Sequence, residues 1–400
     1  MHGYARKRGW LAAALLALAL VAALPEAAFA KPQPGARPRG FRLFARTLGA
    51  MVVNRVYCGL NSGKGQICVD SLGSSTIGGG FWPKGSAQQY VFNSGLQIAG
   101  KINNPGGAWN GDVTGAFFFD PKGTTEHGEE VQPIFNTQDP NDFAAWPDVA
   151  LVPEDPRVPQ NQEIFFQSLL GRKNASQGDV HFLTWDGNPT FVAGRPHPLG
   201  VLVEQRGMGW NYPAGNQDII YFVFTFYNIT SRTAASYASA RPEIQPLLLQ
   251  LGTDFQTRNE AAFNIQLPDG GYTIDSLFAG FAADQDVTNS AGTNFCSVNL
   301  PFALGFCYEH TFQQTDPGPY DPGIFGPPFF AGSGFVGVKY LRGPGGPGAI
   351  QLFSNTINAA TGFRDPQNVG ALFRYLSGNI SAAAGDQACN HLYGDRKSVV

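Results

Sequence analysis

The chain has few charged residues and few cysteines, and it lacks the familiar catalytic motifs. Only 14% of its 400 residues are charged and 43% are apolar, a balance that excludes disorder of the whole chain. It contains no G-x-S-x-G, H-E-x-x-H or Walker motif, and its cysteines lack the spacing of a zinc site. No motif in the sequence therefore indicates a particular enzymatic activity.

Long hydrophobic runs are also missing after the N-terminus. The longest later one, Ile219–Phe226, falls far short of the roughly 20 residues that span a bilayer. Residues 1–30 combine a basic start, an apolar run over Leu11–Leu24 and small residues before position 30, which is typical of a cleaved secretory signal. A membrane anchor is the alternative, but the run is short for one. We expect a secreted protein without a transmembrane segment, located outside the cell, on its surface or in the periplasm.

The charge balance argues against nucleic acid as a partner. Beyond Asp70 the chain has 17 basic and 28 acidic residues, a net charge of −11. An acidic body has no electrostatic footprint for nucleic acid. The segment 31–55 is basic and contains proline and glycine, and we interpret it as a solvated tail. A phosphate-binding or lipid-binding arm is the alternative.

The cysteines predict two local disulfides. Cys58 and Cys68 flank a glycine-rich segment, and Cys296 and Cys307 flank a similar length of chain, as expected in an oxidising compartment. Cys389 is left over, which suggests an intermolecular bridge, a free thiol or a missing partner.

The C-terminus suggests an incomplete chain. Residues 395–400 can be encoded by a widely used sequencing adapter, so we expect a non-native tail after Gly394. The natural protein would then continue into further domains, one of which would hold the partner of Cys389. An ordinary polar C-terminus is the alternative.

Many short aromatic segments separated by glycine and proline predict a mainly β fold. Strand-like segments lie at 90–100, 113–120, 179–186, 199–207, 218–229, 272–284, 304–312, 334–341 and 350–357. We expect antiparallel, β-sandwich-like sheets with long Gly/Pro loops in a β-rich domain over 56–394. A boundary near 152–162 is an alternative.

Two segments allow finer predictions. The segment 218–229 is apolar on both faces, which predicts a central strand covered on each side, paired with 199–207 through the intervening loop. Residues 241–266 have apolar positions at helical spacing, which predicts a helical insertion. It would be one helix, or a pair jointed near Pro246 and Gly252.

Acidic residues offer a candidate for acid–base catalysis. Glu129 and Glu130 follow His127, and Trp185 and Asp186 could face them across a sheet. A glycosidase needs two carboxylates on either side of a sugar ring. An exposed acidic turn is the alternative.

A second acidic group suggests calcium. Asp284 and Asp286 point the same way if their strand continues, and Asn289 could add an oxygen ligand from the following loop. Ordinary turn chemistry is the alternative. No other cofactor is indicated.

Aromatic residues in loops are candidates for binding a glycan or a partner protein. They are Trp109, Trp146, Trp210 and Tyr212. The alternative is that these rings belong to the hydrophobic core, and we expect this for at least half of them.

Several segments resemble a group of secreted proteins of environmental bacteria that has no established activity. They are FWPKG (81–85), YVFNSGLQIAG (90–100), the run from HPLG to NIT (197–230), SVNLPFALGFCYEHTF (297–312) and FFAGSGFVGVKYL (329–341). The resemblance covers most of 56–390. It implies secretion, a β-rich fold and continuation into further β-domains or sorting modules, and it identifies no site residue.

Together these patterns favour an extracellular structural or interaction module that binds a glycan or a partner protein. The alternative is a secreted hydrolase that acts on polysaccharide through paired carboxylates. Opposed carboxylates in a cleft would favour the hydrolase, and outward-facing aromatic rings would favour binding.

Overall fold

The computed structural model describes most of the compact unit Ala45–Val400. The described residues are 47–70, 79–86, 89–119, 126–139, 175–287, 294–309, 334–343, 352–353, 366–379, 381, 384 and 391–392. Several predictions fall outside them, namely those for residues 1–46, Trp146, the boundary at 152–162, Asn289, Cys389 and 395–400. The interpretation of 31–55 as a solvated tail is wrong for its described part, because Leu48–Met51 forms a strand that pairs with residues 58–61, and Met51 is buried. Within the described ranges, the helices are too short or too polar to cross a membrane.

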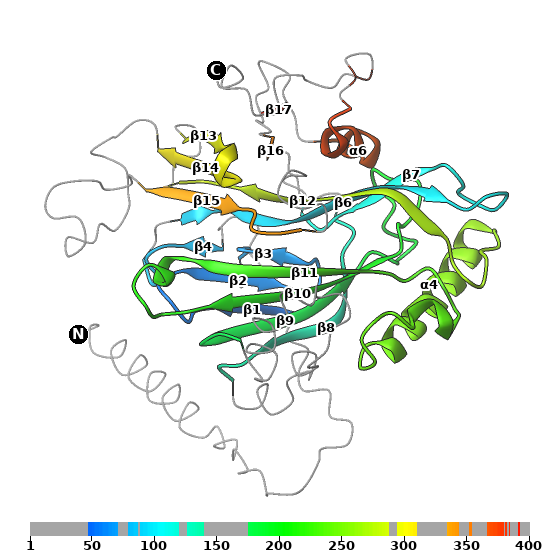
Figure 1. Ribbon diagram of the computed structural model, residues 1–400, viewed down its shortest axis with the longest axis horizontal. Coiled ribbons are helices and arrows are strands. Elements are labelled where there is room, and N and C mark those ends of the chain that lie inside the picture. Colours follow the sequence, from blue (N-terminus) through cyan, green and yellow to red (C-terminus); the bar gives the residue numbers. More distant parts are fainter. Residues whose placement is uncertain are drawn as a thin grey trace, which may run out of the picture. The chain divides into compact units, whose positions relative to one another are not determined.

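The described chain is mainly β, and its strands pair antiparallel, as the sequence predicted (Figure 1). Sheet A contains β1 (Leu48–Met51), β2 (Tyr57–Asn61), β3 (Gln66–Ile67), β4 (Gly80–Phe81), β5 (Gln89–Val91), β6 (Asn93–Asn103), β7 (Val113–Phe117) and β12 (Thr273–Asp284). Sheet B has the order β11 (Ile220–Asn228), β10 (Val201–Gly209), β9 (Gly178–Trp185) and β8 (Glu129–Asn136). Sheet C has the order β13 (Asn294–Asn299), β14 (Leu304–Glu309) and β15 (Phe335–Lys339), and β16 (Leu352–Phe353) pairs with β17 (His391–Leu392).

Sheets A and B share one hydrophobic core. Ile98 of β6, Leu202 of β10 and Phe255 of the helix α4 (Gln245–Phe263) are fully buried in the same cluster. Phe224 of β11 and Phe281 of β12 join the two sheets, with ring centroids 6.0 Å apart. Burying such side chains stabilises each by about 1.5–3 kcal/mol, so this shared core accounts for much of the stability of the sandwich.

β11 is an edge strand of sheet B, not the central strand that its apolar sequence predicted. Within the described residues it pairs only with β10, from Gly209–Ile220 to Val201–Asn228, which confirms the predicted hairpin. The central places belong to β9 and β10, whose side chains are almost all buried. Val223 in the middle of β11 is 50% exposed. The prediction failed because apolar residues on both faces do not reveal which strands lie alongside.

α4 confirms the predicted helix, but as one unbroken helix. Pro246 lies in its first turn, where proline is tolerated, so it makes no joint. Gly252 makes no joint either, since α4 continues through it. It is the residue at which the helix contacts the chain that follows β11. A Cβ at Gly252 would lie 1.9 Å from the carbonyl oxygen of Ser231, so only glycine permits this approach.

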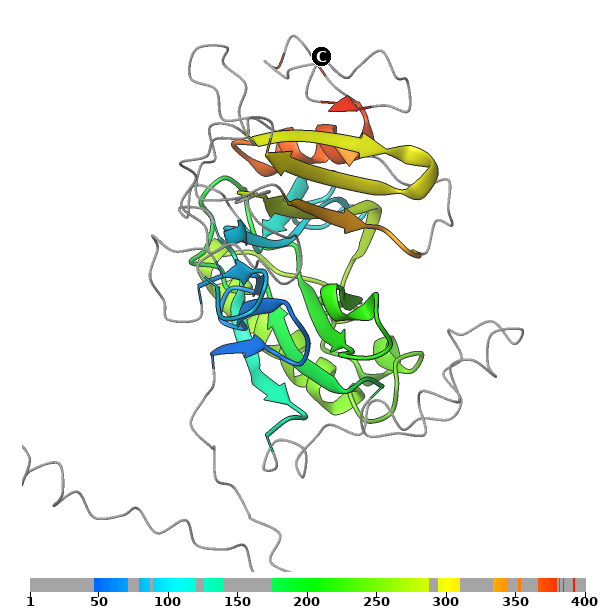
Figure 2. The same ribbon diagram turned by 90° about the vertical axis from the view of Figure 1, so that its left-hand side faces the viewer.

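Two further elements cover sheet A. The helix α6 (Val369–Ser377) buries Val369 and Leu372 against Phe117 of β7. Sheet C packs near β5, where Cys307 is buried with Tyr90. Figure 2 shows the yellow and orange strands of sheet C next to the cyan strands of sheet A, with the green strands of sheet B beyond them.

The cysteines within the described residues lie opposite or close to the partners that the sequence predicted. Cys307 is disulfide-bonded, and the register of β13 and β14 places Cys296 opposite it, so the pairing of these two stays a prediction. Cys58 and Cys68 are thiols with their Sγ atoms 2.8 Å apart. Burial, followed by the contact with Cys68, raises the pKa of the Cys58 thiol well above its usual value.

Closing the Cys58–Cys68 disulfide would need the sulfurs to move from 2.8 Å to about 2.05 Å. We expect the chain to gain this bond in an oxidising compartment, losing two hydrogen atoms that mass spectrometry detects. In the chain-entropy account, a loop of this size stabilises the fold by about 3 kcal/mol. The variant with Cys58→Ala and Cys68→Ala should therefore unfold more readily than the oxidised chain. Two free thiols in chain recovered from an exporting host would contradict the prediction.

Candidate functional site

The loop between β10 and β11 presents two of the aromatic residues predicted to bind. The ring of Trp210 lies edge-on to that of Tyr221, with centroids 5.4 Å apart. Tyr212 projects outward and is 74% exposed. The carbonyl oxygen of Asn211 accepts a hydrogen bond from Gln217 Nε2 at 3.0 Å, which holds the loop together at the base of Tyr212. A fixed loop thus presents an exposed ring.

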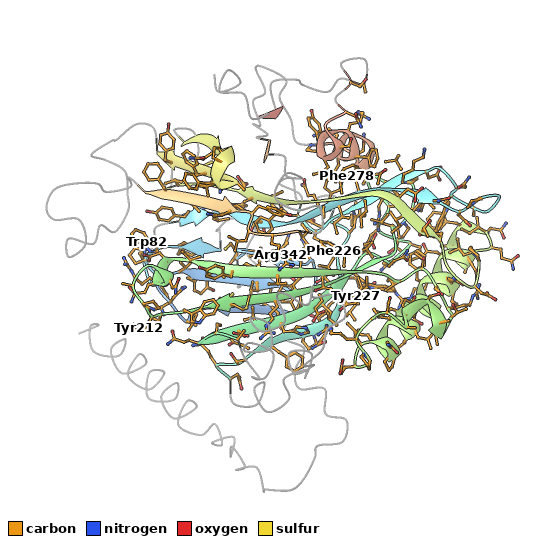
Figure 3. All side chains as sticks on the ribbon, viewed as in Figure 1. Trp82, Tyr212, Phe226, Tyr227, Phe278 and Arg342 are labelled. Carbon is orange, nitrogen blue, oxygen red and sulfur yellow. The ribbon has the colours of Figure 1, made fainter. Side chains whose placement is uncertain are left out.

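A third aromatic residue, Trp82, lies beside this loop. Its Nε1 donates to Asp218 Oδ1 at 2.6 Å, and the same carboxylate oxygen lies 3.4 Å from Arg55 Nε. The guanidinium carbon of Arg55 lies 5.0 Å from the Trp82 ring centroid, within the range of a cation–π contact. We call Arg55, Trp82, Trp210, Tyr212 and Asp218 the aromatic end. Figure 3 shows Trp82 and Tyr212 at the same end of the described structure.

Sequence reasoning missed Trp82 as a site residue, although a signal was present. Trp82 and Tyr212 each precede a proline in a short glycine-containing turn between strands, and both of these peptide bonds are cis. The pattern of an aromatic residue before proline between two strands identifies both rings.

Of the other predicted aromatic residues, Trp109 does not join this site. Trp109 belongs to the core, because its ring stacks on His197 at a centroid distance of 3.9 Å and meets Phe255 and Tyr272 edge-on. Trp146 lies outside the described residues.

Sheet C has a second exposed aromatic surface. The rings of Phe306, Tyr308 and Phe335 lie on one face of β14 and β15, and the last two have centroids 5.3 Å apart. Phe335 is 72% exposed and Phe302 is 62% exposed. Lys339 Nζ lies 5.7 Å from the Phe302 ring. Unlike the aromatic end, this surface has no ion pair within its described residues that fixes a ring in place.

The predicted catalytic carboxylates do not converge. Glu129 Oε2 accepts from Trp185 Nε1 at 3.0 Å, whereas Glu130 Oε2 accepts from Ser62 Oγ at 2.5 Å. Neighbouring residues of a strand point to opposite faces, so these two carboxylates lie on opposite sides of β8. Asp186 is turned into the interior. The arrangement does not give two carboxylates facing one ring.

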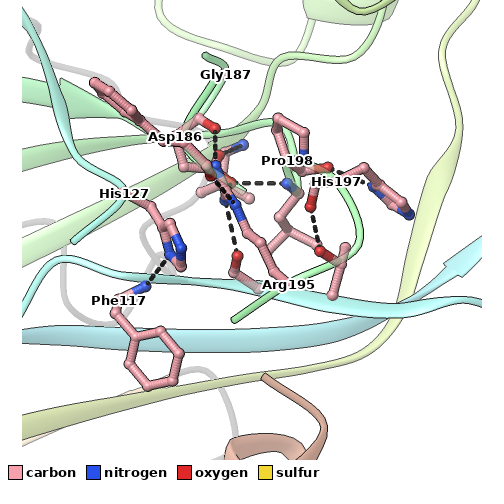
Figure 4. A network of polar contacts seen from close by, with 12 residues as sticks. Phe117, His127, Asp186, Gly187, Arg195, His197 and Pro198 are labelled. Atoms are coloured by element: carbon pink, nitrogen blue, oxygen red, sulfur yellow. Dashed lines mark hydrogen bonds and ion pairs between the residues drawn. The ribbon is translucent and has the colours of Figure 1, made fainter. Parts of the chain in front are cut away.

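Asp186 forms the centre of a buried ion-pair network (Figure 4). Arg195 Nη1 donates to Asp186 Oδ2 at 2.7 Å and to the carbonyl oxygen of Gly115 at 2.8 Å. The backbone N–H groups of Leu199 and Val201 donate to the carboxylate oxygens, each at 2.7 Å. Both charged side chains are fully buried. A carboxylate with these partners holds the β9–β10 connection against β7 and is closed to substrate.

His127, placed with the acidic pair in the sequence, is also structural. Its Nδ1 accepts from the Phe117 N–H at 3.0 Å, and its Nε2 lies 2.7 Å from the Ala193 carbonyl oxygen. The two contacts require neutral imidazole with the proton on Nε2. The ring therefore holds together β7 and the β9–β10 connection.

The calcium prediction gains no support from the described residues. β12 ends at Asp284, so the condition that the strand continues to Asp286 is not met. Asp286 Oδ2 accepts from Gln89 Nε2 at 3.3 Å, and burial raises the pKa of Asp286. The described part of the chain has no group of three acidic, histidine or cysteine side chains placed to hold a metal ion. Asn289 lies outside that part.

A second buried charged network lies on β10 beside α4. Glu204 Oε2 accepts from Arg241 Nη2 at 2.5 Å and from the Tyr227 hydroxyl at 2.8 Å, and Oε1 lies 3.0 Å from His181 Nε2. Burial by itself would raise the pKa of Glu204. The hydrogen bond and charge of His181, followed by those of Arg241, outweigh burial and lower the pKa to about 2.

This network makes the fold sensitive to acid. Because the folded pKa of Glu204 is about 2 against an ordinary value of 4.5, its stabilising effect is complete above pH 4.5 and is lost as the pH falls toward 2. We expect Glu204→Gln to be less stable at pH 7 and to lose less further stability between pH 4.5 and 2.5, measured by urea unfolding. The exposed residue Glu243 offers a control, and Glu243→Gln should behave like the unaltered chain. Equal acid sensitivity in all three would contradict the assignment.

The Asp186 network predicts a loss of stability. Asp186→Asn would leave the Arg195 charge buried without its partner, which costs about 3–5 kcal/mol. Urea unfolding should show this loss. The matched control is Asp218→Asn, which removes a carboxylate whose side chain is 41% exposed and should cost about 1 kcal/mol or less. Unchanged stability in Asp186→Asn would refute a structural role for Asp186.

Comparisons of the chain with protein-family models, with curated proteins and with solved structures give no match.

Proposed function

We propose that the chain is an exported, non-catalytic module that binds carbohydrate at the aromatic end. The observation that carries the proposal is an exposed Tyr212 ring at the same end of the described structure as a half-buried Trp82 ring, which Arg55 and Asp218 hold in place (Figure 3). Sugar rings have apolar C–H faces that pack on aromatic rings, and their hydroxyls hydrogen-bond to charged side chains. A few fixed polar groups beside apolar surface are typical of small-molecule sites.

The charges of the aromatic end favour a neutral ligand. Arg55 and Asp218 pair with each other, so the end carries little net charge of its own. Their side chains are 31% and 41% exposed, so sugar hydroxyls can reach both without breaking the pair. The acidic body of the chain beyond Asp70, with a net charge of −11, disfavours strongly anionic polymers.

Binding is favoured over hydrolysis by the positions of the carboxylates. Glu129, Glu130 and Asp186 have separate partners and do not face a common ring. Export is supported by the N-terminal signal pattern and by the disulfide at Cys307.

A glycan array tests the proposal. The chain should bind neutral glycans, and Tyr212→Ala should weaken the binding of the best one by about tenfold or more, since tyrosine is enriched among the few residues that supply most of the binding energy once a ligand covers them. Tyr212→Phe keeps the ring and should retain most of the affinity.

Phe335→Ala is the matched control, since Phe335 is 72% exposed and Tyr212 is 74% exposed, on a different surface. It should bind like the unaltered chain. Binding that survives Tyr212→Ala, or an array without binding, would refute the proposal. Release of reducing sugar from a bound polysaccharide would show a hydrolase.

A further inference from the structure

β11 differs from the other long edge strands because no device among the described residues protects it from pairing. Exposed strand edges invite pairing with another chain, and proteins block them with charges, prolines, bulges or covering elements. β8, at the other edge of sheet B, contains Glu129, Glu130 and Pro133 and has two register shifts. β12, at the edge of sheet A, has a bulge after Asp275 and lies under α6.

Within the part of the chain that the structure describes, β11 has none of these devices. Its nine residues, IYFVFTFYN, include no charge, proline or glycine, and they pair with β10 without a register shift. Among the described residues, the backbone of β11 makes its hydrogen bonds with β10 alone. Every second residue of an edge strand directs its N–H and C=O groups outward, so a row of donors and acceptors on β11 faces away from the sheet.

We infer that β11 pairs antiparallel with β11 of a second copy of this chain. A two-fold axis brings identical strands together, so the side chains of a suitable strand must be complementary to those of an identical antiparallel strand. An uncharged strand meets this condition, since no like charges come opposite one another.

The sequence of β11 suggests the register. With the axis at its central residue, Phe224, Val223 lies opposite Thr225 of the partner subunit, and Phe222 lies opposite Phe226 of the partner subunit. β-branched and aromatic pairs of this kind stabilise antiparallel ladders. The pairing would join the two copies of sheet B into one continuous sheet.

Sedimentation of the full chain over a wide range of concentrations tests the inference. We expect a dimer that dissociates on dilution. Val223→Lys puts a charge at the middle of the edge, on a side chain that is already 50% exposed, and should weaken association by about tenfold or more. Val223→Thr keeps a β-branched side chain and should still form the dimer, which separates the effect of charge from that of substitution.

Hydrogen exchange of the unaltered chain gives a second readout that does not depend on a variant folding. The amides of Ile220–Asn228 should gain protection as the concentration rises, while those of β8 should not. A monomer at every concentration would overturn the inference. So would a dimer that Val223→Lys leaves intact, or one that forms without added protection of β11. Carbohydrate binding plays no part in this test.

Discussion

The described fold depends on a buried ion pair between Asp186 and Arg195. The carboxylate receives the Arg195 guanidinium and the N–H groups of Leu199 and Val201, and Arg195 reaches Gly115 of sheet A. In a low-dielectric interior each charge needs its partners in place. The pair therefore fixes how the connection from β9 to β10 crosses the end of the sandwich. The same connection also accepts a hydrogen bond from the Val369 N–H at the start of α6, at 2.9 Å to the Gly194 oxygen.

Local elements were predictable because their signals are local. The aromatic and β-branched runs at 179–186 and 199–207 became β9 and β10, and the helical spacing in 241–266 became α4. Strand order was not predictable, because it depends on contacts between distant segments. An apolar run such as β11 is compatible with either a central or an edge position until its neighbours are known.

For the candidate site, too, features with a local signal could be predicted from the sequence, whereas contacts between distant residues could not. Tyr212 and Trp210 could be selected because they lie in a loop between two clear strands. Asp186 was misleading, since an acidic residue between a strand and a glycine resembles an exposed turn. Its partner Arg195 is nine residues away and meets it only after the loop folds back. Trp109 likewise follows a strand, but its ring reaches the core through contacts with α4 and with Tyr272 that its own sequence neighbours do not indicate.

The loop that presents Tyr212 and the strand β11 are consecutive parts of one hairpin. An interaction that restrains the motion of β11 therefore also restrains the base of the loop, and an interaction that restrains the loop also restrains β11. Thermodynamic linkage then requires that any effect of a ligand at the loop on strand pairing at the edge equals the effect of that pairing on the affinity for the ligand. Crowding of such chains on a surface would therefore couple the two proposed events, pairing at β11 and ligand binding at the adjacent loop.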